Sequence, residues 1–232
     1  MSTDQLNFLL WVAIPYCSYT IFWVGHFWRY KKSQYTWTTR STELLEQKLL
    51  RPGILLFHFG MAFVLIGHAG GLLIPQSVTD SIGFSEDAYH VMAVTMGSVA
   101  GFAMAIGLGL LVYRRATNER VRQVTIPRDK LVIAILVIVV LTGLGNLVIM
   151  QWYGGGYNYR ETVSPWVRSI ILFRPQPELM AEAPLTFQIH AMAVMGLFAI
   201  WPFTRLVHAW SVPFPYLKRR FLVFRRRDAL NR

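Results

Sequence analysis

Five long stretches of apolar residues, separated by polar segments, dominate the sequence. They cover residues 6–28, 52–74, 88–113, 131–150 and 187–210. Each stretch has at least 20 residues, and a helix that rises about 1.5 Å per residue over that length crosses the roughly 30 Å of a membrane's hydrocarbon core. The pattern therefore predicts an all-α membrane protein in which residues 1–232 form one domain with five transmembrane helices.

Basic residues are divided unequally between the two sides of these predicted helices. The loops after the first and third helices, together with the region from Arg205 onward, hold 20 lysines and arginines. The loops after the second and fourth helices hold 3. Because short cytoplasmic loops carry the excess of positive charge, we expect the N-terminus outside and the C-terminus in the cytoplasm, with residues 211–232 as a basic cytoplasmic tail.

Composition supports the membrane prediction and excludes several other classes. Hydrophobic residues make up 54% of the chain and charged residues 15%, whereas about 25% of the residues of a soluble domain are charged. The net charge of +11 comes from residues clustered beside the apolar stretches, so we attribute it to membrane orientation and expect no nucleic acid partner. The single cysteine, Cys17, excludes an internal disulfide and a Cys-x-x-Cys-His haem attachment.

Four of the six histidines lie inside the second and fifth apolar stretches: His58, His68, His190 and His208. A polar ring inside a membrane needs a partner, so intramembrane ionisable residues indicate function. His58 and His68 are 10 residues apart and lie on one side of a helix, and the other two, 18 residues apart, share one face. Since the two helices run in opposite directions, His58 lies at the depth of His208. For the same reason, His68 lies at the depth of His190.

Two such pairs of histidines are suited to hold two b-type haems, with one imidazole on each side of each iron. A zinc site needs three or four ligands that converge on one point, which two separate pairs do not supply. The alternative is that the rings are packing residues bonded to hydroxyls or backbone carbonyls. The ligands are about 15 Å apart along the second helix and about 27 Å apart along the fifth. Helix tilt, imidazole reach and a bend at Pro202 have to absorb this mismatch.

Further candidate residues lie near these histidines. Gly67 and three neighbouring glycines would let a flat macrocycle approach the helix, with ordinary helix packing as the alternative. Arg205 is a candidate partner of a haem propionate, or a residue that extends to the lipid headgroups. Tyr89 and His90, at the start of the third helix, are candidates for binding a quinone headgroup or accepting its proton, or for an aromatic anchor at the membrane surface.

Several motifs lie within or directly after the predicted helices. They are Arg29-Tyr30 and Gln34-Tyr35-Thr36-Trp37 after the first helix, Phe57-His58 and Gly67-His68 in the second, and Pro202-Phe203-Thr204-Arg205-Leu206-Val207-His208-Ala209-Trp210-Ser211-Val212-Pro213 at the end of the fifth. Through these motifs, nearly the whole chain resembles the gamma subunit, a dihaem cytochrome b, of membrane-bound respiratory nitrate reductase. The last run is long and specific.

The resemblance implies that His58 and His208 ligate a haem nearer the cytoplasm. It also implies that His68 and His190 ligate a second haem nearer the outside, where quinol is oxidised. In this family, electrons then pass to a cytoplasmic iron–sulfur (beta) subunit and on to a molybdenum (alpha) subunit, which reduces nitrate. The chain is therefore expected in the prokaryotic cytoplasmic membrane as the quinol-oxidising subunit. Enteric members carry a lysine where this chain aligns Tyr89.

Two other functions stay open at this point. One is a related cytochrome b that feeds a sulfite-reduction or heterodisulfide-reductase complex, which copurified partners would identify. The other is a proton or ion transporter that uses the intramembrane histidines as a relay, and such a protein would be colourless when purified. In the favoured interpretation, nitrate chemistry lies in the partner subunits, because this chain has no obvious groups of its own for nitrate reduction.

Overall fold

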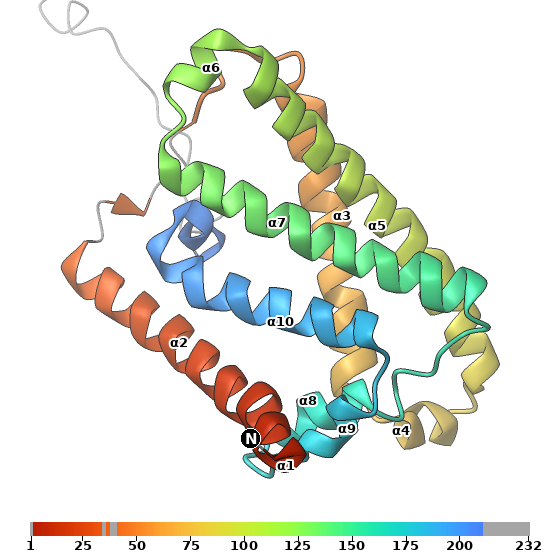
Figure 1. Ribbon diagram of the computed structural model, residues 1–232. Coiled ribbons are helices and arrows are strands. Elements are labelled where there is room, and N and C mark those ends of the chain that lie inside the picture. Colours follow the sequence, from red (N-terminus) through yellow and green to blue (C-terminus); the bar gives the residue numbers. More distant parts are fainter. Residues whose placement is uncertain (1, 34–35, 38–40, 211–232) are drawn as a thin grey trace, which may run out of the picture.

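The computed structural model describes residues 2–33, 36–37 and 41–210 (Figure 1). Five helices are long and apolar enough to cross a membrane: Thr3–Lys32, Leu50–Leu73, Glu86–Thr117, Pro127–Tyr153 and Leu185–Phe203. The prediction of an all-α protein with five such helices is confirmed. The predicted basic tail, residues 211–232, lies outside the described residues, as do the motif residues at 34–35 and 211–213.

The first and fourth of these helices each contain a stretch of wider, π-helical turns. The first runs through α1 (Thr3–Phe8), the π-helical segment η1 (Leu9–Ala13) and α2 (Ile14–Lys32). The fourth runs through α7 (Pro127–Gly145) and the π-helical segment η3 (Asn146–Tyr153). Both helices also extend beyond the apolar stretches that predict them. Residues at their ends continue the helical hydrogen bonding.

The second and third spanning helices, α3 (Leu50–Leu73) and α5 (Glu86–Thr117), pack closely against each other. Gly60 of α3 and Gly107 of α5 lie so near the backbone of the partner helix that an added Cβ would collide with it. Small residues at such crossings allow helix backbones to approach. Short helices occupy the connections: α4 (Gln76–Ser81), α6 (Glu119–Gln123), α8 (Val163–Ile171) and α9 (Pro177–Ala181).

The helix α10 (Leu185–Ile200) belongs to a second packed group. It runs along α7 and α2, whereas α3 runs along α5, and contacts between α5 and α7 join the two groups (Figure 1). Between α3 and α10, which the structure describes in full, the backbones make little close approach. We call the interface between α3 and the fifth span the seam. The four histidines of interest come from its two sides.

The fifth spanning helix ends earlier than its apolar pattern predicts. The helix expected over residues 187–210, with a bend at Pro202, is wrong in its last part. There α10 is followed by two 3-10 segments, η4 (Trp201–Phe203) and η5 (Arg205–Trp210). Pro202 has no N–H to donate, and its ring clashes with the preceding helical turn. Thr204 then adopts an extended backbone with φ −120° and ψ −178°. The chain is redirected at this break before it reaches the last histidine.

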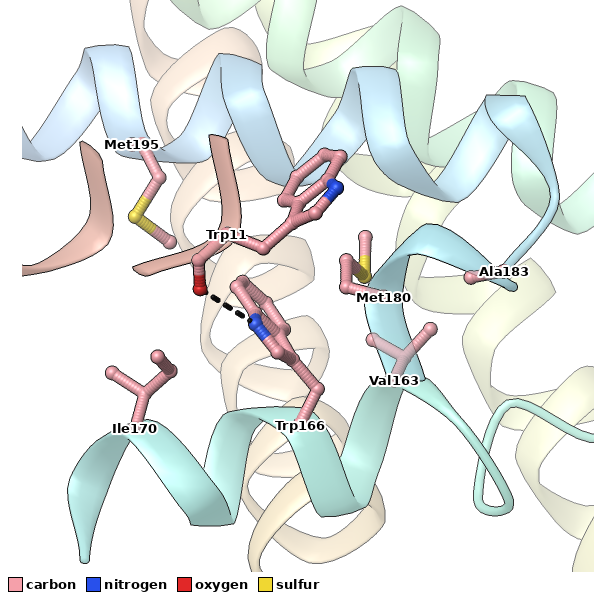
Figure 2. Close-up of a cluster of buried hydrophobic side chains, with 7 residues drawn as sticks. All are labelled: Trp11, Val163, Trp166, Ile170, Met180, Ala183 and Met195. Carbon is pink, nitrogen blue, oxygen red and sulfur yellow. Dashed lines mark hydrogen bonds between the residues drawn. The ribbon is translucent and has the colours of Figure 1, made fainter. Parts of the chain in front are cut away.

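A core of buried side chains closes one end of the bundle, where η1, α8, α9 and α10 meet (Figure 2). It consists of Trp11, Val163, Trp166, Ile170, Met180, Ala183 and Met195. The indole N–H of Trp166 donates to the carbonyl of Trp11 at 3.0 Å, and the two indoles meet edge to face. The helix α8 (Val163–Ile171) supplies three of these side chains. We call this the α8 end of the molecule, and the opposite end, which carries α6, the α6 end.

Candidate cofactor site

Two pairs of histidines face each other across the seam. The ring centroids of His68 and His190 are 6.2 Å apart. Those of His58 and His208 are also 6.2 Å apart. The structure therefore brings together the two pairs that helix face and depth predict. Because a metal–imidazole bond is about 2 Å long, two imidazoles on opposite sides of one iron have ring centres about 6 Å apart, and both observed separations fit this arrangement.

The two histidines of α3 are oriented by their own helix. Nδ1 of His58 lies 2.9 Å from the carbonyl oxygen of Ile54. Nδ1 of His68 lies 2.8 Å from the carbonyl oxygen of Val64. A carbonyl oxygen only accepts, so Nδ1 carries the proton in both rings. Nε2 then keeps its lone pair, which is the form of neutral imidazole that binds a metal.

The two histidines of the fifth span are oriented in different ways. Nδ1 of His208 lies 2.7 Å from the carbonyl oxygen of Arg205, within the same 3-10 segment. Nδ1 of His190 lies 3.0 Å from the hydroxyl of Thr142 in α7. That hydroxyl donates its own proton to the carbonyl of Ile138 at 2.8 Å, so it accepts from His190. All four rings thus leave Nε2 as the nitrogen with the lone pair. Their role as haem ligands stays a prediction.

The glycines near the histidines of α3 fall into two groups. Gly60 and Gly71 are packing residues, since a Cβ on the first would meet the α5 backbone and a Cβ on the second would meet two tyrosine hydroxyls. An added Cβ on Gly67 or Gly70 meets no atom within 4 Å. The open surface at Gly67 fits the approach of a flat macrocycle next to His68.

Arg205, the candidate partner of a haem propionate, is paired with a carboxylate of the chain itself. Its guanidinium lies 2.7 Å from Asp129 in the first turn of α7. Arg115 lies 3.9 Å from the other oxygen of the same buried carboxylate. The role of Asp129 was missed from the sequence, because an acidic residue in the first turn of a helix is ordinarily explained by capping.

Arg29, which belongs to the motif after the first helix, holds the break in the fifth span. Its Nη1 donates to the carbonyl of Pro202 at 2.6 Å and to that of Thr204 at 2.7 Å. Carbonyls at a helix end have no partner within the helix, so the guanidinium satisfies groups that the break leaves free. Together with the ion pair to α7, these bonds fix η5 and its histidine from two sides.

The two candidate quinone residues lie at the α8 end and have different partners. The hydroxyl of Tyr89 lies 3.0 Å from that of Tyr159, and the guanidinium of Arg160 lies 4.0 Å from the centre of its ring. Burial, and then the hydrogen bond to Tyr89, raise the pKa of Tyr159, so the Tyr159 hydroxyl keeps its proton. Nε2 of His90 lies 2.8 Å from the amide oxygen of Gln151. The structure therefore does not bring the two side chains into one shared contact.

Arg160, buried in the long loop after the fourth span, ties the α8 end together. Its guanidinium lies 2.8 Å from Glu86 at the start of α5 and 3.0 Å from the hydroxyl of Thr79 in α4. Nearby, Ser164 donates to the carbonyl of Gly71 at 2.8 Å. The contact between Arg160 and Glu86 spans 74 positions of the chain, so no local sequence pattern could have revealed it.

These features define the class of the protein. It is a helical membrane protein with five spanning helices and two pairs of facing histidines at two depths. Within the residues that the structure describes, no group of three or more His, Cys, Asp or Glu side chains is arranged to hold a metal ion. The histidine pairs suit a planar cofactor that takes one axial ligand on each face.

Comparison with known proteins identifies the family. A family model described as the nitrate reductase gamma subunit matches residues 7–227, and the chain belongs to this family. It is 44% identical over 220 residues to the nitrate reductase gamma chain of Bacillus subtilis, covering 95% of this chain and 98% of that protein. It is 34% identical over 225 residues to the respiratory nitrate reductase 2 gamma chain of Escherichia coli, covering 97% and 99%. The resemblance drawn from the motifs is confirmed.

Two other relatives differ in extent. The chain is 47% identical over 228 residues, 98% of its length, to the nitrate reductase-like protein NarX of Mycobacterium tuberculosis, and it spans 35% of that protein. It is 24% identical over 162 residues, 69% of its length, to the Hdr-like menaquinol oxidoreductase cytochrome b-like subunit of Archaeoglobus profundus, of which it covers 46%. With five helices able to cross a membrane, this member of the gamma subunit family is a multi-pass membrane protein of the bacterial type.

Proposed function

We propose that the chain is the membrane-anchor cytochrome b subunit of a respiratory nitrate reductase, built as a single membrane domain. In this proposal it oxidises quinol at the α8 end, which faces outward, and passes the electrons through two b haems to the cytoplasmic side. There an iron–sulfur (beta) subunit takes them up and delivers them to a molybdenum (alpha) subunit. The observation that carries the proposal is the ring separation of 6.2 Å in both histidine pairs of a chain of this family.

Each histidine pair would supply two imidazole Nε2 atoms to one iron. The ligands are His58 and His208 toward the α6 end, and His68 and His190 toward the α8 end. Two haems held in this way would supply one-electron redox chemistry, which suits the stepwise removal of the two electrons of a quinol. The chain contributes rings whose Nδ1 atoms are already engaged, which lowers the reorganisation needed to bind the iron.

The ion pair at Arg205 supports a structural part of the proposal. The guanidinium already contacts Asp129, yet an arginine has five N–H donors and this contact uses only part of them. Arg205 therefore retains donors for a haem propionate at the α6 end while Asp129 fixes its position. We therefore propose that Arg205 contacts a haem propionate and Asp129 at the same time. The contact with Asp129 is already present in the fold.

His90 supports quinol oxidation at the α8 end through its tautomer. The amide oxygen of Gln151 accepts from Nε2, and the amide nitrogen of Gln151 donates to the carbonyl of Tyr157 at 2.9 Å, which fixes the orientation of the amide. Nδ1 of His90 is then the nitrogen with the lone pair, and it is the acceptor for a quinol hydroxyl proton. Tyr89, whose hydroxyl bonds to that of Tyr159, is the second polar group that we propose for the quinol headgroup at this end. Oxidation on this side releases protons outward while electrons move inward, which generates membrane potential.

The haem content of the purified protein tests the proposal. A pyridine haemochrome assay combined with protein quantitation is expected to give two b haems per chain. A colourless protein would contradict the proposal and would favour the histidine-relay transporter. Copurified iron–sulfur and molybdenum subunits with nitrate reductase activity would distinguish this complex from one of the heterodisulfide-reductase type, and the isolated chain is expected to reduce no nitrate.

The quinol site is tested separately by quinol-driven haem reduction. Tyr89→Phe and His90→Gln are expected to slow the reduction of both haems by quinol, while reduction by dithionite stays complete. Tyr113→Phe, at the other end of the same helix, is the matched control and is expected to leave the rate unchanged. Unchanged rates in both test variants would remove Tyr89 and His90 from the site.

A further inference from the structure

Among the four paired histidines, His190 has a side-chain hydrogen-bond partner at Nδ1, whereas the partners of the other three rings are backbone carbonyls. Nδ1 of His58, His68 and His208 each face a carbonyl of their own helical segment. Nδ1 of His190 faces the hydroxyl of Thr142, which lies in a different helix, 48 positions away in the chain. Among these four rings, His190 is therefore the one whose orienting group can be removed by substitution.

The hydroxyl of Thr142 acts as the hydrogen-bond acceptor for Nδ1 of His190. It has a single proton, which it directs at the carbonyls of its own helix, 2.8 Å from Ile138 and 3.1 Å from Val139. The remaining lone pairs face the imidazole. A hydroxyl oxygen carries less negative charge than an amide oxygen, so it withdraws less of the Nδ1 proton from His190 than the carbonyls withdraw from the other three rings.

The next residue of α7, Gly143, leaves room for the same ring. A Cβ added there would lie 3.1 Å from Cε1 of His190, 3.6 Å from Nδ1 and 3.7 Å from Nε2. All three are imidazole atoms, so the ring of His190 lies directly against the α7 backbone. A methyl group at this position would have to push the ring away, because a carbon–carbon approach of 3.1 Å is closer than ordinary van der Waals contact.

The geometry points to Thr142 and Gly143 as positioning residues for His190, through which α7 sets the redox potential of the haem at the α8 end and leaves the other haem unaffected. The hydroxyl of Thr142 accepts a hydrogen bond from the Nδ1–H of His190, and Gly143 sets the plane of the ring. An acceptor at Nδ1 raises the basicity of a metal-bound imidazole and so stabilises the more positively charged metal. This inference rests on the proposed function, since it concerns a haem held by the His68–His190 pair.

The test is a redox titration of both haems in the purified complex. Thr142→Val removes the acceptor with little change of shape and is expected to raise the midpoint potential of the His190-bound haem, with the other midpoint unchanged. Thr142→Ser keeps the hydroxyl and is expected to retain the wild-type value. Thr95→Val is the matched control, because Thr95 makes the same bond to its own helix, 2.7 Å to Val91, and its described hydrogen bonds include none to a histidine.

Gly143→Ala is read out by the low-spin EPR signal of the same haem, which depends on the angle between the two imidazole planes. That angle is 44° between His68 and His190. The added methyl group is expected to move the EPR signal of this haem alone. Gly145→Ala, in the same helix, is the control, because a Cβ at Gly145 meets no atom within 4 Å.

Three outcomes decide the inference. It is overturned if Thr142→Val shifts neither midpoint potential, or both equally, in a protein that still holds two haems. If Thr142→Val loses a haem, Thr142→Ser decides, because a normal potential there supports the inference and a lost haem overturns it. A wild-type protein without haem defeats the proposed function instead, so the two failures are distinguishable.

Discussion

The two histidine pairs have the same ring separation, but different structures hold them. At the α8 end, His68 and His190 lie within the regular helices α3 and α10. At the α6 end, His58 also lies on α3, whereas His208 lies on the six-residue 3-10 segment that follows the helix break. The first pair is positioned by the backbone hydrogen bonds of two regular helices. The second pair also depends on side-chain bonds that hold the broken end of the fifth span, from Arg29 in α2 and Asp129 in α7.

This difference shows where sequence spacing is informative. A histidine inside a regular helix is placed by the 3.6-residue period, so its face and depth follow from its position in the sequence. A histidine beyond a break is placed by the groups that hold the broken segment. Substitutions of charged residues should therefore act on the pair at the α6 end, and substitutions of hydroxyls and glycines on the pair at the α8 end.

Removing one ligand from each pair is expected to have the largest effect. His190→Ala should delete one b-type haem from the reduced-minus-oxidised spectrum and leave the other, and His208→Ala should delete the second in the same way. His26→Ala, which removes an intramembrane histidine outside both pairs, is the control and should retain two haems. Two full haems in either ligand variant would contradict the assignment.

Asp129→Asn is expected to weaken the α6 end selectively. The variant leaves Arg205 and Arg115 without the carboxylate that both contact. Because these groups are largely buried, we expect the free energy of unfolding to fall by about 3 kcal/mol. The melting temperature should fall, and the haem that we assign to His208 should be lost before the other. Asp87→Asn, at the α8 end, is the control. Equal loss of both haems would remove the distinction between the two ends.

Arg29→Lys is expected to have a smaller effect on the same haem. Lysine keeps the charge but has one donor nitrogen, whereas the guanidinium bonds the carbonyls of Pro202 and Thr204 through Nη1 and that of Thr36 through Nη2. At least one of these bonds is therefore lost. We expect a destabilisation of about 1 kcal/mol and a shift in the EPR signal of the haem at the α6 end. Arg168→Lys, which changes a donor to Leu72 at the α8 end, is the matched control. A shift of both signals in Arg29→Lys would argue against a local role.

The smallest expected effect is a loss of stability in acid, through the carboxyl of Glu46 at the α6 end. The backbone N–H of Leu49 and then the guanidinium of Arg114 hold the pKa of Glu46 below its usual value. A carboxyl with a lower pKa in the folded state stabilises the fold above its unfolded pKa, and this contribution is lost as the pH falls through the folded pKa. The melting temperature of Glu46→Gln should therefore fall less steeply than that of the wild type below about pH 4.5. Parallel curves would contradict this.

Much of the fold could be predicted from the sequence, because its main determinants are local. Runs of apolar residues locate all five spans, and the helix period brings His68 opposite His190 without any knowledge of the other side chains. The stop at Pro202 shows the limit of this reasoning. A proline predicts a disturbed helix, but whether the chain bends or leaves the helix depends on partners for the freed carbonyls.

The parts of the site that were missed depend on distant contacts. Arg29 and Pro202 are 173 positions apart, and Asp129 and Arg205 are 76 apart. Thr142, inside an apolar run, has the ordinary pattern of a threonine bonded to its own helix, and nothing local indicates that its hydroxyl also meets His190. Such contacts become visible when the packing of α7 against α10 is known.

The seam between α3 and the fifth span has a consequence for the fate of newly made protein. The helices α3 and α10 approach each other little along this line, and the proposed haems would lie there. A chain synthesised during haem shortage would lack the groups that connect these two helices. We expect such a chain to separate along the seam and to be degraded by membrane proteases. The cellular amount of the subunit would then follow the supply of porphyrin and iron.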